Sequence, residues 1–283
     1  RITQRNLRKF MNQRPEGHDN ASSIESLLPI DDHIEEGHDS EGRKVRHKGI
    51  YLLPNLFTTA NLFAGFYSIM CAINGNFTVA AATVFVAMVL DGLDGRVARM
   101  TNTQSAFGAE YDSLSDMVAF GLAPAIIAYQ WALSELGNVG LTIAFIYVAC
   151  AALRLARFNT QIGVVDKRWF IGLASPAAAG LVAGVVWALS DNGVGAVDLP
   201  VVVIMLFAVL VALAGMLMVS NVKYYSFKDL DLKGRVPFVA ILVVVLAFAV
   251  VFSDPPRILL LMFLVYAVSG PVQFVLRKRQ AKQ

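Results

Sequence analysis

The chain has 283 residues, of which 56% are hydrophobic and only 16% are charged, and its formal net charge is +3. The apolar residues occur in blocks long enough to cross a bilayer, so this composition argues against a soluble domain. Cys71 and Cys150 lie in separate apolar blocks and have no metal-ligand spacing. We therefore expect two buried free thiols and no disulfide framework.

The first 49 residues form a polar stretch with charges of both signs, and they contain all four histidines of the chain. Because we find no signal-peptide core there, residues 1–49 are predicted to form a partly disordered cytoplasmic tail. A histidine metal site in this tail is the alternative interpretation. The irregular spacing of the histidines argues against it; they are His18, His33, His38 and His47.

Eight apolar segments follow the tail, and each is long enough to span a membrane as a helix. They are approximately residues 55–73, 78–99, 106–133, 140–158, 173–190, 199–219, 236–252 and 257–276. The predicted fold class is therefore all-α, a polytopic membrane helix bundle with about eight transmembrane helices. This transmembrane domain covers residues 50–276, and residues 277–283 form a basic cytoplasmic tail.

The connections between these segments predict how the bundle is oriented. Alternate connections are rich in lysine and arginine, whereas the others hold almost no cations apart from Arg257. The cations are Arg154, Arg157, Lys167, Arg168, Lys223, Lys228, Lys233 and Arg235, followed by Arg277, Lys278, Arg279 and Lys282 in the tail. Positive charge marks the cytoplasmic side, so both termini are expected in the cytoplasm. An even number of spans requires the same.

Four aspartates occur in the stretch 91–116, which reads DGLDGRVARMTNTQSAFGAEYDSLSD. Asp91 and Asp94 share one face of the second segment, and Asp112 and Asp116 share one face of the third. The two segments are expected to be antiparallel neighbours joined by a short polar turn. We therefore expect Asp91 to face Asp116 and Asp94 to face Asp112, as a box of carboxylates in the cytoplasmic half of the membrane.

A solvated acidic loop is the alternative interpretation of this cluster, but apolar runs at 79–90 and 117–132 enclose it on both sides. Four carboxylates this close cannot all stay ionised without counter-charge. Arg96 and Arg99 cannot both point into the box. Hard divalent cations with oxygen ligands, Mg²⁺ or Mn²⁺, are the natural partners, and two such ions could clamp the phosphates of a substrate.

Three glycines accompany the aspartates, at positions 92, 95 and 108. They remove side chains where a bulky ligand would approach the helix backbone. Alternatively, Gly92, Gly95 and Gly108 only allow helices to pack closely. Spacing alone does not decide between these two interpretations.

The aspartates belong to a longer pattern, Asp-x2-Asp-Gly-x2-Ala-Arg-x8-Gly-x3-Asp-x3-Asp, which residues 91–116 match without a gap. This pattern resembles the signature of the CDP-alcohol phosphatidyltransferases. Four further stretches are similar to the bacterial phosphatidylserine synthases of that family. They are LPNLFTTANLFAGF (53–66), DSLSDMVAFGLAPA (112–125), RLARFN (154–159) and FIGLASPAAAG (170–180).

The resemblance implies a CDP-diacylglycerol–serine O-phosphatidyltransferase. In such an enzyme the hydroxyl of L-serine attacks the lipid-side phosphorus of CDP-diacylglycerol and gives phosphatidylserine and CMP. Carried over from the family, Asp91, Asp94 and Asp112 bind the divalent metal, Mg²⁺ or Mn²⁺, as two ions. Asp116 is the general base and also approaches the second ion.

The resemblance also implies where the substrates bind. The residues for CDP-diacylglycerol are Asn55, Thr58, Gly95, Arg99, Ser105 and Gly108. For the serine carboxylate we expect Arg154, Arg157 and Asn159, because the fourth segment ends there on the cytoplasmic side and arginine can bind a carboxylate as a fork. The alternative is that these arginines are positive-inside anchors only.

The same family comprises enzymes with other acceptor alcohols, such as glycerol phosphate, inositol phosphate or choline, which share the aspartates. A cation transporter would spread acidic residues along a path through the membrane, but the outer halves of the segments contain none. A purely structural membrane protein would have no use for four buried aspartates. We expect a homodimer in the bacterial inner membrane, with its active site facing the cytoplasm and no nucleic-acid partner.

Overall fold

The computed structural model describes residues 34–38, 44–48, 52–101, 105–160, 169–195, 199–225 and 238–280. The chain divides into two units, Arg1–Ile50 and Tyr51–Gln283. In the first unit, β1 (Ile34–His38) pairs antiparallel with β2 (Lys44–Lys48), in a register that sets Glu36 opposite Arg46. The sequence does not predict this hairpin. The rest of the predicted tail at 1–49 lies outside the described residues.

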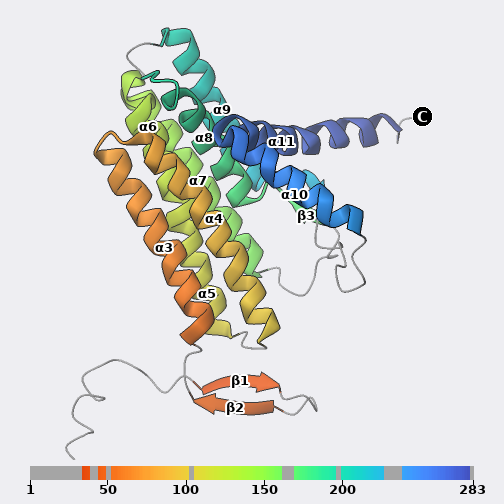
Figure 1. The fold of residues 1–283 in the computed structure, drawn as a ribbon. Coiled ribbons are helices and arrows are strands. Elements are labelled where there is room, and N and C mark those ends of the chain that lie inside the picture. The colour runs from red at the N-terminus through yellow and green to blue at the C-terminus, as the bar shows by residue number, and fades with distance from the viewer. Residues whose placement is uncertain are drawn as a thin grey trace, which may run out of the picture. The chain divides into compact units, whose positions relative to one another are not determined.

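The second unit is a bundle of helices, as Figure 1 shows. Its first half consists of α3 (Leu52–Ile73), α4 (Phe77–Met100), α5 (Ala106–Asp116), the π-helical segment η1 (Met117–Leu122), α6 (Ala123–Trp131) and the 3₁₀ turn η2 (Leu133–Leu136). Its second half consists of α7 (Asn138–Thr160), α8 (Ser175–Ser190), α9 (Val201–Val219), α10 (Phe238–Ser253) and α11 (Pro255–Gln280). Two short strands, β3 (Trp169–Ile171) and β4 (Lys223–Tyr225), pair antiparallel between these helices.

All eight predicted apolar segments are helical, which confirms the all-α membrane class. Among the described residues, five helices are long and apolar enough to cross a bilayer: α3, α4, α7, α9 and α11. The third predicted segment is continuous from α5 through η1 to α6, and α8 and α10 have 16 residues each. The chain is thus a multi-pass membrane protein. The number of eight spans and the side of the termini stay predictions.

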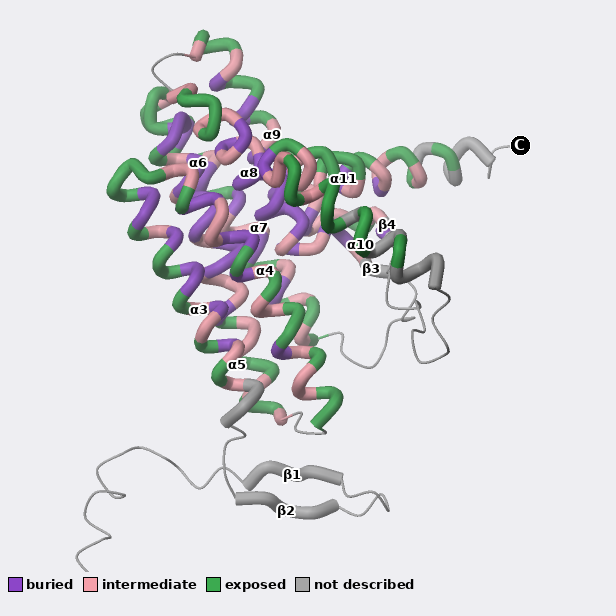
Figure 2. The backbone as a smooth tube through the Cα atoms, in the orientation of Figure 1, coloured by how far each residue is buried: buried purple, intermediate pink, exposed green. Residues whose placement is uncertain are grey.

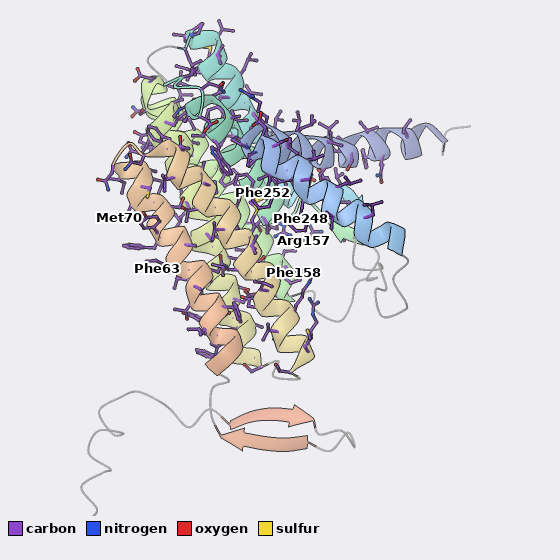
Figure 3. The ribbon with its side chains drawn as sticks, viewed as in Figure 1. Phe63, Met70, Arg157, Phe158, Phe248 and Phe252 are labelled. Atoms are coloured by element: carbon purple, nitrogen blue, oxygen red, sulfur yellow. The ribbon has the colours of Figure 1, made fainter. Side chains whose placement is uncertain are left out.

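Small residues allow the helices of the bundle to approach closely. A Cβ atom on Gly65 of α3 would lie 2.7 Å from Cα of Ala119, and one on Gly215 of α9 would lie 3.2 Å from Cα of Tyr147. Figure 2 shows buried residues gathered along the inner sides of the helices, while exposed ones follow their outer sides. On α3, Phe63 and Met70 point away from the bundle (Figure 3) and are 64% and 40% exposed. Such apolar outer faces suit contact with lipid.

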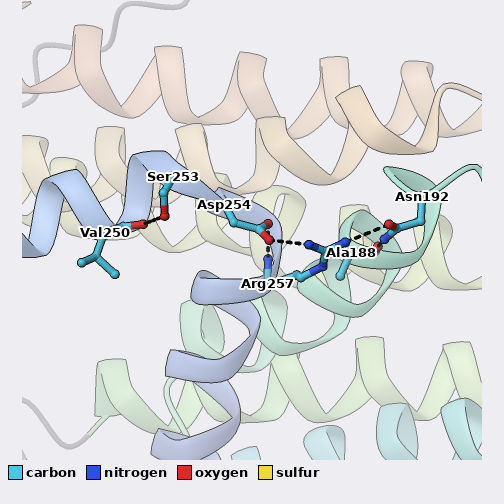
Figure 4. Close-up of polar contacts among 6 residues, drawn as sticks. All are labelled: Ala188, Asn192, Val250, Ser253, Asp254 and Arg257. Atoms are coloured by element: carbon cyan, nitrogen blue, oxygen red, sulfur yellow. Dashed lines mark hydrogen bonds and ion pairs between the residues drawn. The ribbon is translucent and has the colours of Figure 1, made fainter.

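Arg257 bonds to the residue that precedes α11 and to the connection after α8, as Figure 4 shows. Its Nη1 lies 2.6 Å from Oδ2 of Asp254, and its Nη2 donates to Oδ1 of Asn192 at 2.8 Å. The arginine side chain is 62% exposed, so the ion pair contributes at most about 1 kcal/mol. Both cysteines are free, as predicted: Cys71 is buried and Cys150 is partly buried.

Candidate active site

Two neighbouring helices bring the four aspartates together. Asp91 and Asp94 lie in the last three turns of α4, and Asp112 and Asp116 lie in the second half of α5. Carboxylate oxygens of Asp91, Asp112 and Asp116 lie within 4.8 Å of one another, and all three residues are partly buried. The expected meeting of Asp91 with Asp116 is therefore present.

Asp94 is the most deeply buried of the four, with 5% of its surface exposed. Its Oδ2 accepts a hydrogen bond of 3.0 Å from Oγ1 of Thr58 on α3. Its carboxyl group is also close enough to that of Asp112 for a direct interaction, as expected from their positions. Asp94 thus belongs to the cluster but is oriented by a neighbouring helix.

Helix α3 supports the aspartates with a row of polar groups. Besides the Thr58 hydroxyl, Nδ2 of the fully buried Asn61 donates to Oδ1 of Asp116 at 3.1 Å. The backbone carbonyl of Thr58 accepts from Oγ of Ser115 at 3.0 Å. The sequence prediction missed Asn61 and Ser115. A signal for Asn61 exists, because Asn55, Thr58 and Asn61 recur every three residues in a segment that is mostly apolar.

Three of the residues predicted for the nucleotide gather where α5 begins. Oγ of Ser105 caps the helix by accepting from the backbone N–H of Gly108 at 2.9 Å. A Cβ on Gly108 would lie 3.7 Å from Oδ1 of Asn55. The N-terminus of a helix also favours anionic groups. Asn55 of α3 thus lies beside Ser105 and Gly108, which precede Asp112 by seven and four residues.

The glycines of α4 face open space. Among the described residues, a Cβ on Gly92 would have no neighbour within 4 Å, and one on Gly95 would have only Nη2 of Arg99, at 4.0 Å. Close helix packing therefore does not explain these two glycines, and the backbone of α4 is accessible beside its aspartates. Gly95 and Arg99 are one helical turn apart, so they lie on the same side of α4. A ligand that approaches this side of the helix can reach both.

One cation that the sequence prediction did not assign to the aspartates lies within electrostatic range of them. Arg154 of α7 interacts electrostatically with Asp116 and Asp91. Its Nη1 donates to the hydroxyl of Ser175 in the first turn of α8, and its buried Nε has no hydrogen-bond partner among the described residues. Arg154 is therefore a partial counter-charge for the cluster, and Ser175 is a further polar group that the sequence prediction missed.

The other two residues predicted for the acceptor lie in different surroundings. Arg157 donates to the carbonyl of Val219 at 3.4 Å and to Oδ1 of Asn221 at 2.9 Å, so it links α7 to the end of α9. Asn159 accepts from the Ser113 hydroxyl and donates to Glu110, which ties the end of α7 to α5. Of the three, only Arg154 interacts electrostatically with the aspartates among the described residues, and it makes no ion pair with them there.

The donor set fits a hard divalent cation. Three carboxylates of like charge share a partly buried site, and the one ion pair found among the described residues lies elsewhere, at Arg257. Oδ1 of Asp112 is buried and has no hydrogen-bond partner among the described residues. A buried acceptor without a donor is costly, and an oxygen-binding ion would satisfy it. Asp91, Asp112 and Asp116 are therefore placed to hold such an ion, with Asp94 beside them.

Comparisons with known proteins agree with this arrangement. The family model for CDP-alcohol phosphatidyltransferases matches residues 51–214. The chain is 39% identical over 226 residues to a CDP-diacylglycerol–serine O-phosphatidyltransferase of Helicobacter pylori, covering 80% of this chain and 92% of the relative. It is 33% identical to the enzyme of that name from Methanocaldococcus jannaschii, covering 80% and 96%. It is also 38% identical to an archaetidylserine synthase of Methanothermobacter thermautotrophicus, covering 45% and 54%.

Proposed function

The chain belongs to the CDP-alcohol phosphatidyltransferase family, and we propose that it transfers the phosphatidyl group of CDP-diacylglycerol to L-serine. The observation that carries this proposal is the aspartate cluster of α4 and α5, inside a membrane bundle and within the family signature. The acceptor is inferred from the relatives named for serine, which cover most of this chain. The products are phosphatidylserine and CMP.

The aspartates divide between two tasks. Asp91, Asp94 and Asp112 would hold divalent ions, Mg²⁺ or Mn²⁺, and Asp116 would be an additional ligand at the second ion. When bound, the ions neutralise charge on the phosphate oxygens of the donor. Enzymes of this family depend in general on divalent metals, and the clustered carboxylates found here suit that chemistry.

Asp116 is also placed to activate the acceptor. A hydroxyl is a poor nucleophile until a base accepts its proton. Asp116 takes the proton of the serine hydroxyl as its oxygen forms a bond to the lipid-side phosphorus. The bond from that phosphorus to the oxygen of CMP breaks, and CMP leaves with the electron pair.

The nucleotide half of the donor binds along the two aspartate helices. Asn55, Ser105 and Gly108 surround the start of α5, where helix N–H groups favour a phosphate. Gly95 and Arg99 bind the nucleotide along the open side of α4. Thr58 contributes through Asp94, to which its hydroxyl donates.

The acceptor is recognised by its carboxylate. Arg154 is partly buried, its Nε has no hydrogen-bond partner among the described residues, and it interacts electrostatically with Asp116, so it can bind the carboxylate of a serine whose hydroxyl faces that aspartate. Arg157 and Asn159 border this region through their contacts with α9 and α5. We further propose that the protein acts as a homodimer in the bacterial inner membrane, with this site open to the cytoplasm, where serine is available.

Turnover of purified protein tests the proposal. CMP release from CDP-diacylglycerol is measured with L-serine, glycerol phosphate, inositol phosphate and choline, each with EDTA, Mg²⁺ or Mn²⁺. We expect release with serine alone, and only when a divalent metal is present. Faster release with another alcohol would reassign the acceptor, and activity in excess EDTA would refute the metal assignment.

A further inference from the structure

Asn61 has no assigned role, although it is one of the most enclosed polar side chains of the bundle. It lies in the middle of α3 with no exposed surface, and its Nδ2 donates to Oδ1 of Asp116 at 3.1 Å. Its own Oδ1 is buried without a hydrogen-bond partner among the described residues. A buried amide retained only for stability would be expected to satisfy both ends. Asn61 satisfies only the end that faces the aspartate.

The bond from Asn61 distinguishes the two oxygens of Asp116. Oδ1 is engaged by the amide, so Oδ2 is the oxygen without a bond from Asn61 and the one available to accept a proton. A carboxylate without such a bond rotates about its last side-chain torsion, which has a broad and nearly two-fold profile. One hydrogen bond from a rigid, fully buried helix position removes that freedom.

Thr58 performs the corresponding task for Asp94 from the same helix. The two donors are three residues apart, so they lie on one face of α3, and each binds one aspartate of a different pair. Helix α3 thus orients one carboxylate from α4 and one from α5. Asn61 therefore differs from an ordinary buried amide, because it and Thr58 each donate to one aspartate of the cluster.

We propose that Asn61 is a positioning residue that fixes the carboxylate of Asp116, with Oδ2 directed at the acceptor hydroxyl. The inference rests on the proposed function, in which Asp116 accepts the proton of that hydroxyl. Proton transfer depends on the placement of the base within hydrogen-bond reach, whereas binding of the lipid donor does not. Loss of Asn61 therefore lowers the rate of the chemical step and spares donor binding.

The test compares Asn61→Leu with Ser68→Ala on the same helix. Leucine keeps the branched shape of asparagine and has no polar atom, so it removes the bond to Asp116 and leaves no unsatisfied amide or cavity. Its side chain is larger than that of asparagine. Ser68 is equally buried and donates to the carbonyl of Ala80 at 2.7 Å, away from the aspartates, so its loss is a matched control. Asn61→Ala is made as a second variant in case leucine does not fold.

We expect kcat of Asn61→Leu to fall roughly 10- to 100-fold, with KM for serine and Kd for CDP-diacylglycerol changed less than about threefold. Ser68→Ala should keep its kcat within about twofold of the wild type. Thermal stability and gel-filtration behaviour of each variant show whether the fold is intact. Equal losses of kcat and donor binding, or an unchanged kcat, would overturn the proposal. So would a kcat that recovers fully at high Mg²⁺, because Asn61 would then position a metal ligand only.

Failure of this inference can be told apart from failure of the proposed function. If wild-type protein releases no CMP with any alcohol, the proposed function is wrong, and the comparison of variants has no basis. If wild-type protein turns over serine and Asn61→Leu does so equally fast, only the role of Asn61 is wrong. If another alcohol proves to be the acceptor, the same comparison is made with that alcohol.

Discussion

Two polar clusters of this membrane protein show how differently charge can be used in one bundle. Arg257, Asp254 and Asn192 combine a cation, an anion and an amide whose bonds satisfy one another, and the arginine is largely exposed. The aspartate cluster gathers like charges in a partly buried site and leaves buried atoms of Asp112, Asn61 and Arg154 without partners among the described residues. The first cluster is complete as folded. In the second cluster, the like charges have no ion-pair partner and these buried atoms have no hydrogen-bond partner among the described residues, and a cation and a substrate would supply them.

The two clusters also lie toward opposite ends of α4. The turn before α4 lines the same pocket as the connection after α8, which holds Asn192, whereas Asp91 and Asp94 lie near the other end of the helix. A polar group in a membrane bundle is therefore not by itself a sign of function. Missing partners and like charge are the better criteria.

The largest loss of turnover is expected when a metal ligand of the aspartate cluster is removed. Asn in place of Asp91, Asp94 or Asp112 should lower turnover by at least about 10³-fold, since each replacement removes negative charge from the ion site. CMP release is the measurement, and chelation of wild-type protein should give the same loss. Asp254→Asn is the matched control, which should retain its activity. Near-normal turnover of any of the three variants would remove that residue from the metal site.

Removing the base should separate binding from chemistry. Asp116→Asn should lower kcat on the order of 10²-fold or more, because an amide cannot accept the serine proton. The Kd for CDP-diacylglycerol should change much less, as measured by titration calorimetry in detergent with Mg²⁺. Parallel losses of binding and rate would make Asp116 chiefly a metal ligand.

A smaller effect is expected for the acceptor, where two arginines of α7 differ in surroundings. Arg154→Ala should raise the KM for serine about tenfold, equivalent to about 1.4 kcal/mol of lost binding. Arg154→Lys should rescue it only in part, because lysine keeps the charge but loses the fork. The KM for the lipid donor should stay nearly constant, as measured at saturating serine.

Arg157→Ala is the matched variant, since among the described residues this arginine binds Val219 and Asn221 and makes no bond to an aspartate. Its serine KM should move less than that of Arg154→Ala. A larger effect at Arg157 than at Arg154 would place the carboxylate site at the end of α7. No effect at either residue would leave both arginines as topological anchors.

The smallest effect on stability and turnover is expected at the cluster of Arg257, Asp254 and Asn192. Arg257→Ala removes an exposed ion pair, so the free energy of unfolding should fall by no more than about 1 kcal/mol. Serine turnover should be unchanged within error. A thermal melt and a CMP-release assay of the same preparation measure both, and a loss of activity without a loss of stability would assign this cluster a function.

Local patterns were enough to predict the eight helical segments and the meeting of the aspartates of α4 with those of α5. Apolar length identifies a span, and spacing along one helix identifies a shared face. Contacts between helices distant in sequence were not predicted, including the bonds of Asn61 to Asp116 and of Arg154 to Ser175. A pattern within one segment does not say which residue of another helix faces it. The pairing of β3 with β4 was not predicted for the same reason, whereas the β1–β2 hairpin is local and its polar sequence has no strand pattern.

The π-helical segment η1 begins directly after Asp116, at Met117. A wider turn adds a residue to the helix, which shifts everything beyond it by about 100° in phase relative to a regular helix. The two halves of one long helix can therefore face different neighbours: the aspartates of α5 meet α4, while Trp131 at the end of α6 meets Phe207 of α9 edge-on at 5.2 Å. Deleting one residue within η1 would restore a regular helix and turn either the carboxylates or the tryptophan away from its partner.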